Sequence, residues 1–78
     1  MSLANRALWT IDRNLTGELS LSSVAENCGV SRYHLAHAFG ETTGMSVMEY
    51  VRERRLSEAA ADLARGKLNI LDLAMEYG

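Results

Sequence analysis

Hydrophobic residues recur with helical spacing along most of the chain, and no segment alternates as a β-strand does. A first helix is predicted over residues 3–14, with an apolar stripe formed by Leu8, Ile11 and Leu15. A break follows at Thr16-Gly17-Glu18. Trp9 and, later in the chain, Tyr50 are predicted to belong to the core. The pattern as a whole predicts an all-α fold.

Residues 20–40 are predicted to form two short helices joined by a tight turn. The inward positions of the first are Leu21, Val24, Ala25 and Cys28. Gly29 suits the positive φ of a sharp reversal, and Ser31 can cap the helix that follows. This pattern is typical of a helix-turn-helix, whose second helix usually lies in the major groove of DNA. The alternative is a helical corner that builds a core and binds no ligand.

A longer helix is predicted from Ser46 to about residue 64. Ser46 followed by Glu49 forms a capping box, and Thr43-Gly44 ends the helix before it. The apolar face changes sides along its length. One side carries Val47, Tyr50, Val51 and Arg54, and the opposite side carries Leu56, Ala59, Ala60 and Leu63. We therefore expect a bridge that packs its first half on the preceding module and its second half on something after it.

The last nine residues repeat an earlier pattern, because residues 70–78 overlay residues 21–29 in their apolar positions, their small Ala and their final Gly. The interpretation is a first helix-turn-helix subdomain (1–45), a linker helix (46–66) and the first helix of a truncated second helix-turn-helix (67–78). Ile70, Leu73 and Tyr77 would then lack a cover. They would be disordered, fold back on the linker helix, or drive self-association against a neighbouring chain.

Composition narrows the function classes. The 78 residues suffice for one small domain. No segment is long and apolar enough to span a membrane, no secretion signal stands out, and the single Cys28 fits a reducing cytoplasm. The formal net charge is −2, and between residues 21 and 55 four arginines are balanced by four glutamates. A DNA-binding protein normally carries a basic surface, so the basic residues must gather on one face or the chain supplies only part of the binding surface.

No constellation of catalytic or cofactor-binding residues is present. His34 and His37 stand three apart, but no further ligand at suitable spacing completes a metal site. The acidic residues show no paired arrangement for acid–base chemistry. We therefore expect a protein that is not an enzyme and holds no metal, cofactor or small molecule in this segment. Arg52, Arg54 and Arg55 could contact phosphates, or pair with glutamates on their own helix, as Glu49 with Arg52 and Arg54 with Glu58 could.

Specific motifs support one family. The run LSLSSVAENCGVSRYHLAHAFGETTGMSVMEYVRERRLSEAAADL, followed by NILDLAMEYG, resembles the DNA-binding domain of the AraC/XylS family of bacterial transcription regulators. The resemblance covers nearly the whole chain. It implies a homeodomain-like three-helix unit with a helix-turn-helix, a long linker helix and a second helix-turn-helix, with double-stranded DNA as the partner.

The resemblance also implies which residues read DNA. The recognition helix would span residues 31–40, with Tyr33, Ala36 and His37 facing base edges. Ser31, Arg32 and His34 would lie at the helix start near the DNA backbone. Two positions depart from common members of the family. Gly40 stands where Lys or Arg often follows the Phe, and Ala36 offers only a methyl group, which can touch a thymine but makes no hydrogen bond.

Two functions from different classes remain at this point. The first is sequence-specific DNA binding within a transcription regulator. A linker helix of about 19 residues spans roughly 28 Å, close to the distance of about 34 Å between successive major-groove sites on one face of B-DNA. The second is a helical protein–protein interaction module, which the acidic balance favours. The outward-facing Arg-Tyr-His-His segment favours the first.

Overall fold

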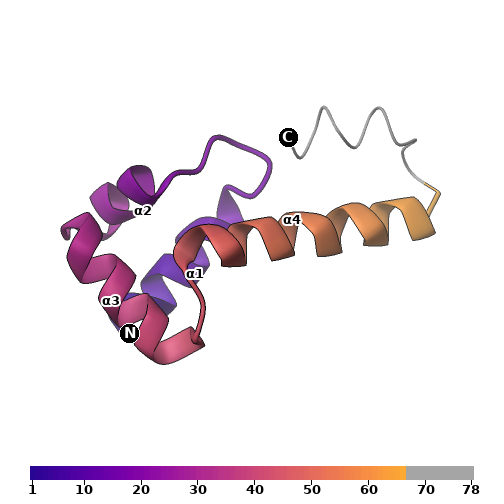
Figure 1. Ribbon diagram of the computed structural model, residues 1–78. Coiled ribbons are helices and arrows are strands. Elements are labelled where there is room, and N and C mark those ends of the chain that lie inside the picture. Colours follow the sequence, from indigo (N-terminus) through magenta and orange to yellow (C-terminus); the bar gives the residue numbers. More distant parts are fainter. Residues whose placement is uncertain (67–78) are drawn as a thin grey trace.

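The computed structural model describes residues 1–66, which form four helices. They are α1 (Leu3–Arg13), α2 (Leu21–Cys28), α3 (Arg32–Thr43) and α4 (Val47–Ala64). Helices α1, α2 and α3 pack around one core, and α4 passes α1 and continues beyond the bundle (Figure 1). No strand occurs between residues 1 and 66, in agreement with the predicted all-α fold. The predictions for residues 67–78, including an exposed apolar helix and self-association through it, lie outside the described residues.

The core draws its side chains from all four helices and the segment after α1. Phe39, Ile11, Leu35, Val24 and Val51 are its largest fully buried members. Burying a side chain of this size stabilises the fold by about 1.5–3 kcal/mol. Smaller side chains complete the cluster, namely Ala7, Leu15, Ala25, Cys28 and Val47. Burial of Cys28 agrees with its predicted inward position, where a free thiol packs as a small hydrophobic side chain.

Trp9 is not a core residue, so that prediction was wrong. Its side chain is 55% exposed, and the guanidinium of Arg13 lies 4.4 Å from the centre of the indole ring. The buried stripe of α1 consists of Ala4, Ala7 and Ile11. Trp9 is two residues from both Ala7 and Ile11, about 200° around the helix from each, and so faces away from the core. Tyr50 is partly buried, with its ring edge-on to Phe39 at 5.8 Å, in agreement with its predicted place.

A serine caps the start of every helix in the described part of the chain. The hydroxyl oxygens of Ser2, Ser20, Ser31 and Ser46 each accept a hydrogen bond from the backbone N–H three residues later. Such caps satisfy N–H groups that have no partner inside the helix. At α4 the cap is reciprocal, because the Ser46 N–H donates to Glu49 Oε1 at 2.9 Å. The predicted capping box is therefore confirmed.

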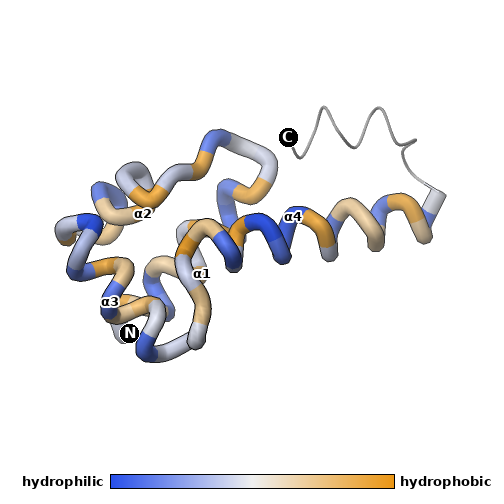
Figure 2. The backbone as a smooth tube through the Cα atoms, viewed as in Figure 1, coloured by the Kyte–Doolittle hydropathy of each residue, from blue (hydrophilic) through white to orange (hydrophobic). Residues whose placement is uncertain are grey.

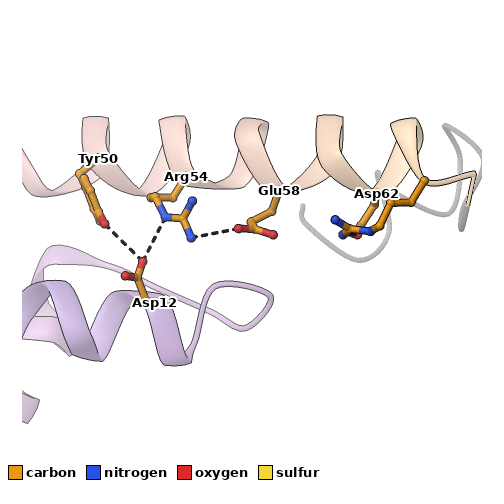
Figure 3. A network of polar contacts seen from close by, with 6 residues as sticks. Asp12, Tyr50, Arg54, Glu58 and Asp62 are labelled. Atoms are coloured by element: carbon orange, nitrogen blue, oxygen red, sulfur yellow. Dashed lines mark hydrogen bonds and ion pairs between the residues drawn. The ribbon is translucent and has the colours of Figure 1, made fainter.

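The first half of α4 is joined to α1 by a polar network (Figure 3). The Asp12 carboxylate on α1 accepts hydrogen bonds from the Tyr50 hydroxyl at 3.3 Å and from Arg54 Nε at 3.2 Å. Arg54 also donates to Glu58 at 3.0 Å, which confirms the predicted pair on one helix. Burial, followed by the charge of Asp12, raises the pKa of the Tyr50 hydroxyl. The hydrogen bond to Asp12 raises the pKa of the Arg54 guanidinium.

Arg55 fixes the loop that follows α1. Its guanidinium donates to the backbone oxygens of Leu15 at 3.0 Å and Gly17 at 2.8 Å. Hydrogen bonds from a charged donor are stronger than those between neutral groups. Together with Arg54, this side chain ties α4 to the end of α1 and to the loop beyond it, and so sets the direction in which α4 leaves the bundle.

The second half of α4 carries hydrophobic positions beyond the end of the bundle (Figure 2). Leu56 is 65% exposed and Leu63 is 45% exposed, whereas Val47 and Val51 in the first half are buried. The predicted change of face along this helix is therefore present. Residues 67–78 were predicted to pack on the face that carries Leu56 and Leu63, and these residues lie outside the described part of the chain.

Two glycine substitutions are predicted to change stability in opposite directions. Gly29 has a φ of 72°, and Gly40 lies inside α3 with ordinary helical geometry. An added Cβ meets nothing within 4 Å at Gly29 and only Met45 O at 4.0 Å at Gly40. Gly29→Ala should lower the free energy of unfolding by about 1–2 kcal/mol through backbone strain. Gly40→Ala should raise it by about 0.5–1 kcal/mol. Urea titrations of both variants measure the two changes in the free energy of unfolding. Changes of equal sign would contradict the prediction.

The capping box of α4 predicts an acid-dependent loss of stability. Hydrogen bonds from the backbone and side chain of Ser46 hold the pKa of the Glu49 carboxyl below its ordinary value of 4.5, with a further contribution from Arg52. A lowered pKa in the folded state stabilises the protein above the unfolded pKa, and this stabilisation is lost as the pH falls through the folded pKa. Between pH 6 and pH 3 the wild type should therefore lose more stability than Glu49→Gln. Urea unfolding at both pH values tests this, and equal losses would count against the cap.

The Asp12–Arg54 contact is predicted to be energetically coupled. Both side chains are partly exposed, at 45% and 33%, so the pair is screened by solvent. A double-mutant cycle with Asp12→Asn and Arg54→Met should give a coupling free energy of about 0.5–1 kcal/mol. Thermal and urea unfolding of the four proteins supply the values. Strict additivity would mean that the contact does not help to hold α4.

Candidate nucleic-acid interface

The corner between α2 and α3 is built by local hydrogen bonds. Gly29 ends α2 in the left-handed conformation, and its N–H donates to Glu26 O at 3.0 Å while the Val30 N–H donates to Ala25 O at 3.1 Å. Arg6 of α1 donates to Cys28 O at 2.6 Å, where a cation also complements the negative end of the helix dipole. The predicted glycine turn is confirmed, and α1 reinforces it.

Helix α3 presents one apolar and one polar side. Leu35 and Phe39 are fully buried against the rest of the bundle. The predicted DNA-binding residues are exposed without exception, and these are Ser31, Arg32, Tyr33, His34, Ala36 and His37. Tyr33 alone is 80% exposed. The structure thus gathers these six residues at the start and on the outer side of a single helix.

The recognition helix is longer than the 31–40 segment taken from the resemblance. It continues to Thr43 and ends at Gly44, which has a φ of 74° and lies where the stop signal was predicted. Gly40 is therefore inside the helix and not at its end. The extra turn brings Glu41 onto the outer side, a residue that was not among the predicted site residues.

Three exposed side chains form a line along the outer side of α3. The Tyr33 and His37 rings are nearly parallel, with centroids 6.0 Å apart and an angle of 8° between their planes. His37 Nε2 lies 3.1 Å from Glu41 Oε1. The i, i+4 spacing of a helix places such residues above one another. Sequence spacing alone could have found this line once the helix was extended to Thr43.

Most cations of the described chain are engaged within the protein. Between residues 1 and 66 the arginines with such contacts are Arg6, Arg13, Arg54, Arg55 and Arg65. Arg32 and Arg52 make no hydrogen bond or ion pair within the same range. Arg32 lies at the first position of α3 with its charge directed to solvent, which leaves it available to a phosphate.

The described part of the chain lacks both a cluster of metal-binding side chains and a helix that could span a membrane. In the described part of the chain, no group of three or more His, Cys, Asp or Glu side chains could hold a metal ion. None of the helices within residues 1–66 has the length and hydropathy required to cross a membrane.

Comparisons with known proteins agree with this geometry. A family model described as a helix-turn-helix domain matches residues 24–78. The transcriptional activator AarP of Providencia stuartii is 38% identical over 76 residues, which are 97% of this chain and 56% of AarP. The multiple antibiotic resistance protein MarA of Escherichia coli is 41% identical over 68 residues, which are 87% of this chain and 54% of MarA.

The TetD protein of transposon Tn10 from Escherichia coli is a third relative, with 37% identity over 70 residues, 90% of this chain and 50% of TetD. The chain thus spans about half the length of these relatives. No solved structure matches it. The matched helix-turn-helix model and these relatives place the chain in the AraC/XylS family of transcription regulators.

Proposed function

We propose that this chain binds double-stranded DNA in a sequence-specific manner as part of a bacterial transcription regulator, with α3 in the major groove. The observation that carries the proposal is the division of α3 into a fully buried side, Leu35 and Phe39, and an outer side of exposed polar residues. An α-helix with its side chains is about 10–12 Å across, and the major groove is about 12 Å wide. The named relatives support the same class, because AarP is described as a transcriptional activator.

The residues of α3 divide into two roles. Ser31 and Arg32 lie at the helix start, where free N–H groups, the positive end of the dipole and a guanidinium all favour a phosphate. His34, one turn into the helix, would also lie near the DNA backbone. Tyr33 and His37 offer hydrogen-bonding groups to base edges, and the methyl group of Ala36 suits the methyl group of a thymine.

Helix α4 is proposed to act as an arm between two DNA-reading modules. The supporting observation is its anchorage up to the middle of the helix, through Arg54 and Arg55, and the exposure of Leu56 and Leu63 beyond that point. In this division residues 1–45 form one module, residues 46–66 form the arm, and residues 67–78 begin a second module. The site of action would be the bacterial cytoplasm, where the DNA is.

Removal of the Arg32 charge provides the direct test. Arg32→Ala should weaken binding to all duplexes to a similar degree, because a phosphate contact carries no sequence information. The slope of log affinity against log salt should become shallower by about 1. Fluorescence anisotropy with labelled duplexes at several salt concentrations measures both quantities.

Arg13→Ala is the matched control, since it removes the same charge from α1, where Arg13 lies over Trp9. Its salt slope should stay close to that of the wild type. Binding that does not weaken with added salt, or an Arg32→Ala slope equal to that of the wild type, would contradict the proposal. A salt-independent interaction would instead favour a protein partner.

A further inference from the structure

Glu41 is an unexpected residue on a DNA-facing surface, because DNA is polyanionic. Its side chain is 71% exposed and lies on the same side of α3 as Tyr33 and His37. An exposed carboxylate in this position opposes non-specific binding through repulsion from phosphates. A contribution to general affinity for DNA therefore does not account for Glu41 at this position.

The position of Glu41 around the helix places it in the groove in the proposed binding mode. At about 100° per residue, His37 points about 180° away from the midpoint between Leu35 and Phe39, the two fully buried residues. Tyr33 and Glu41 lie about 40° to either side of His37. Glu41 is thus as central to the outer side as Tyr33 is, about 12 Å further along the helix axis.

Gly40 leaves room for a base beside Glu41. It contributes no side chain to the outer part of α3, and a Cβ there would meet only Met45 O, at 4.0 Å. Helix α3 therefore protrudes less toward solvent at Gly40 than it would with a larger side chain there. In the proposed binding mode, the absence of a side chain at position 40 would let base edges approach this turn closely enough for the shorter reach of a glutamate.

We infer that Glu41 is a specificity-determining residue that accepts a hydrogen bond from the N4 amino group of a cytosine in the major groove. Of the four bases, cytosine presents an amino donor there with no acceptor on the same base. Guanine presents two acceptors and thymine presents one, and each would repel a carboxylate. Adenine presents its N6 donor beside the N7 acceptor. This inference depends on the proposed DNA binding and adds a base preference to it.

His37 acts on Glu41 as a positioning residue in this arrangement. Its Nε2 lies 3.1 Å from Glu41 Oε1, so the imidazole keeps the carboxylate beside it on the outer side of α3. The second carboxylate oxygen remains available, since an ionised carboxylate accepts several hydrogen bonds. The parallel Tyr33 ring supports His37 from the other side, so the three residues form one pre-organised reading surface.

In vitro selection from a randomised duplex library tests the inference with the whole 78-residue chain at low salt. The wild type should enrich a motif that contains an invariant C·G pair. Glu41→Ala should lose the preference at that pair alone. Its affinity for the wild-type motif should fall about five- to ten-fold, while its affinity for the motif with T·A at that pair should rise, because the repulsion is removed.

Glu53→Gln is the control, since it removes one negative charge from an exposed position on α4 and should keep the selected motif unchanged. Circular dichroism establishes that each variant remains helical. An unchanged base preference in Glu41→Ala, with the wild type selecting a motif, would overturn this inference and leave the proposed function standing. Failure of the wild type to retain any duplex would overturn both.

Discussion

The burial of Leu35 and Phe39 is the interaction on which the rest of this molecule depends. These two side chains hold one side of α3 in the core and thereby determine which residues face outward. The serine caps and the Gly29 turn define where each helix begins and ends, but they do not orient α3 about its own axis. Hydrophobic burial supplies that orientation, because a rotation of the helix would expose two large apolar side chains to water.

A second constraint sets the direction of α4. Asp12, Arg54 and Arg55 join α4 to α1 and to the loop that follows α1 through hydrogen bonds from charged groups. Each contact is modest by itself, because the groups are partly exposed. They act on one short segment, however, and apolar packing of Val47 and Val51 adds to them. The helix therefore leaves the bundle in a defined direction, as its proposed role as an arm would require.

The few charges that the fold leaves unengaged suit the proposed binding of DNA with selectivity more than with high general affinity. Most arginines within residues 1–66 are engaged in contacts within the protein, and Arg32, at the start of α3, and Arg52 are not. The outer side of α3 further along carries a neutral glycine and a carboxylate where a basic surface would be the simplest solution. A net charge of −2 fits a protein in which non-specific attraction to DNA is weak.

The sequence by itself determined the helices, the caps, the glycine turn and the change of face along α4, because each of these depends on residues within a few positions of one another. The exposure of the six predicted DNA-binding residues followed from the same local periodicity and from the family resemblance. Only the tertiary structure decided that Trp9 lies outside the core and that Arg54 and Arg55 are held by Asp12 and by the loop carbonyls. Those partners are about 40 residues apart in the chain, and periodicity carries no information about which distant groups the packing of two helices brings together.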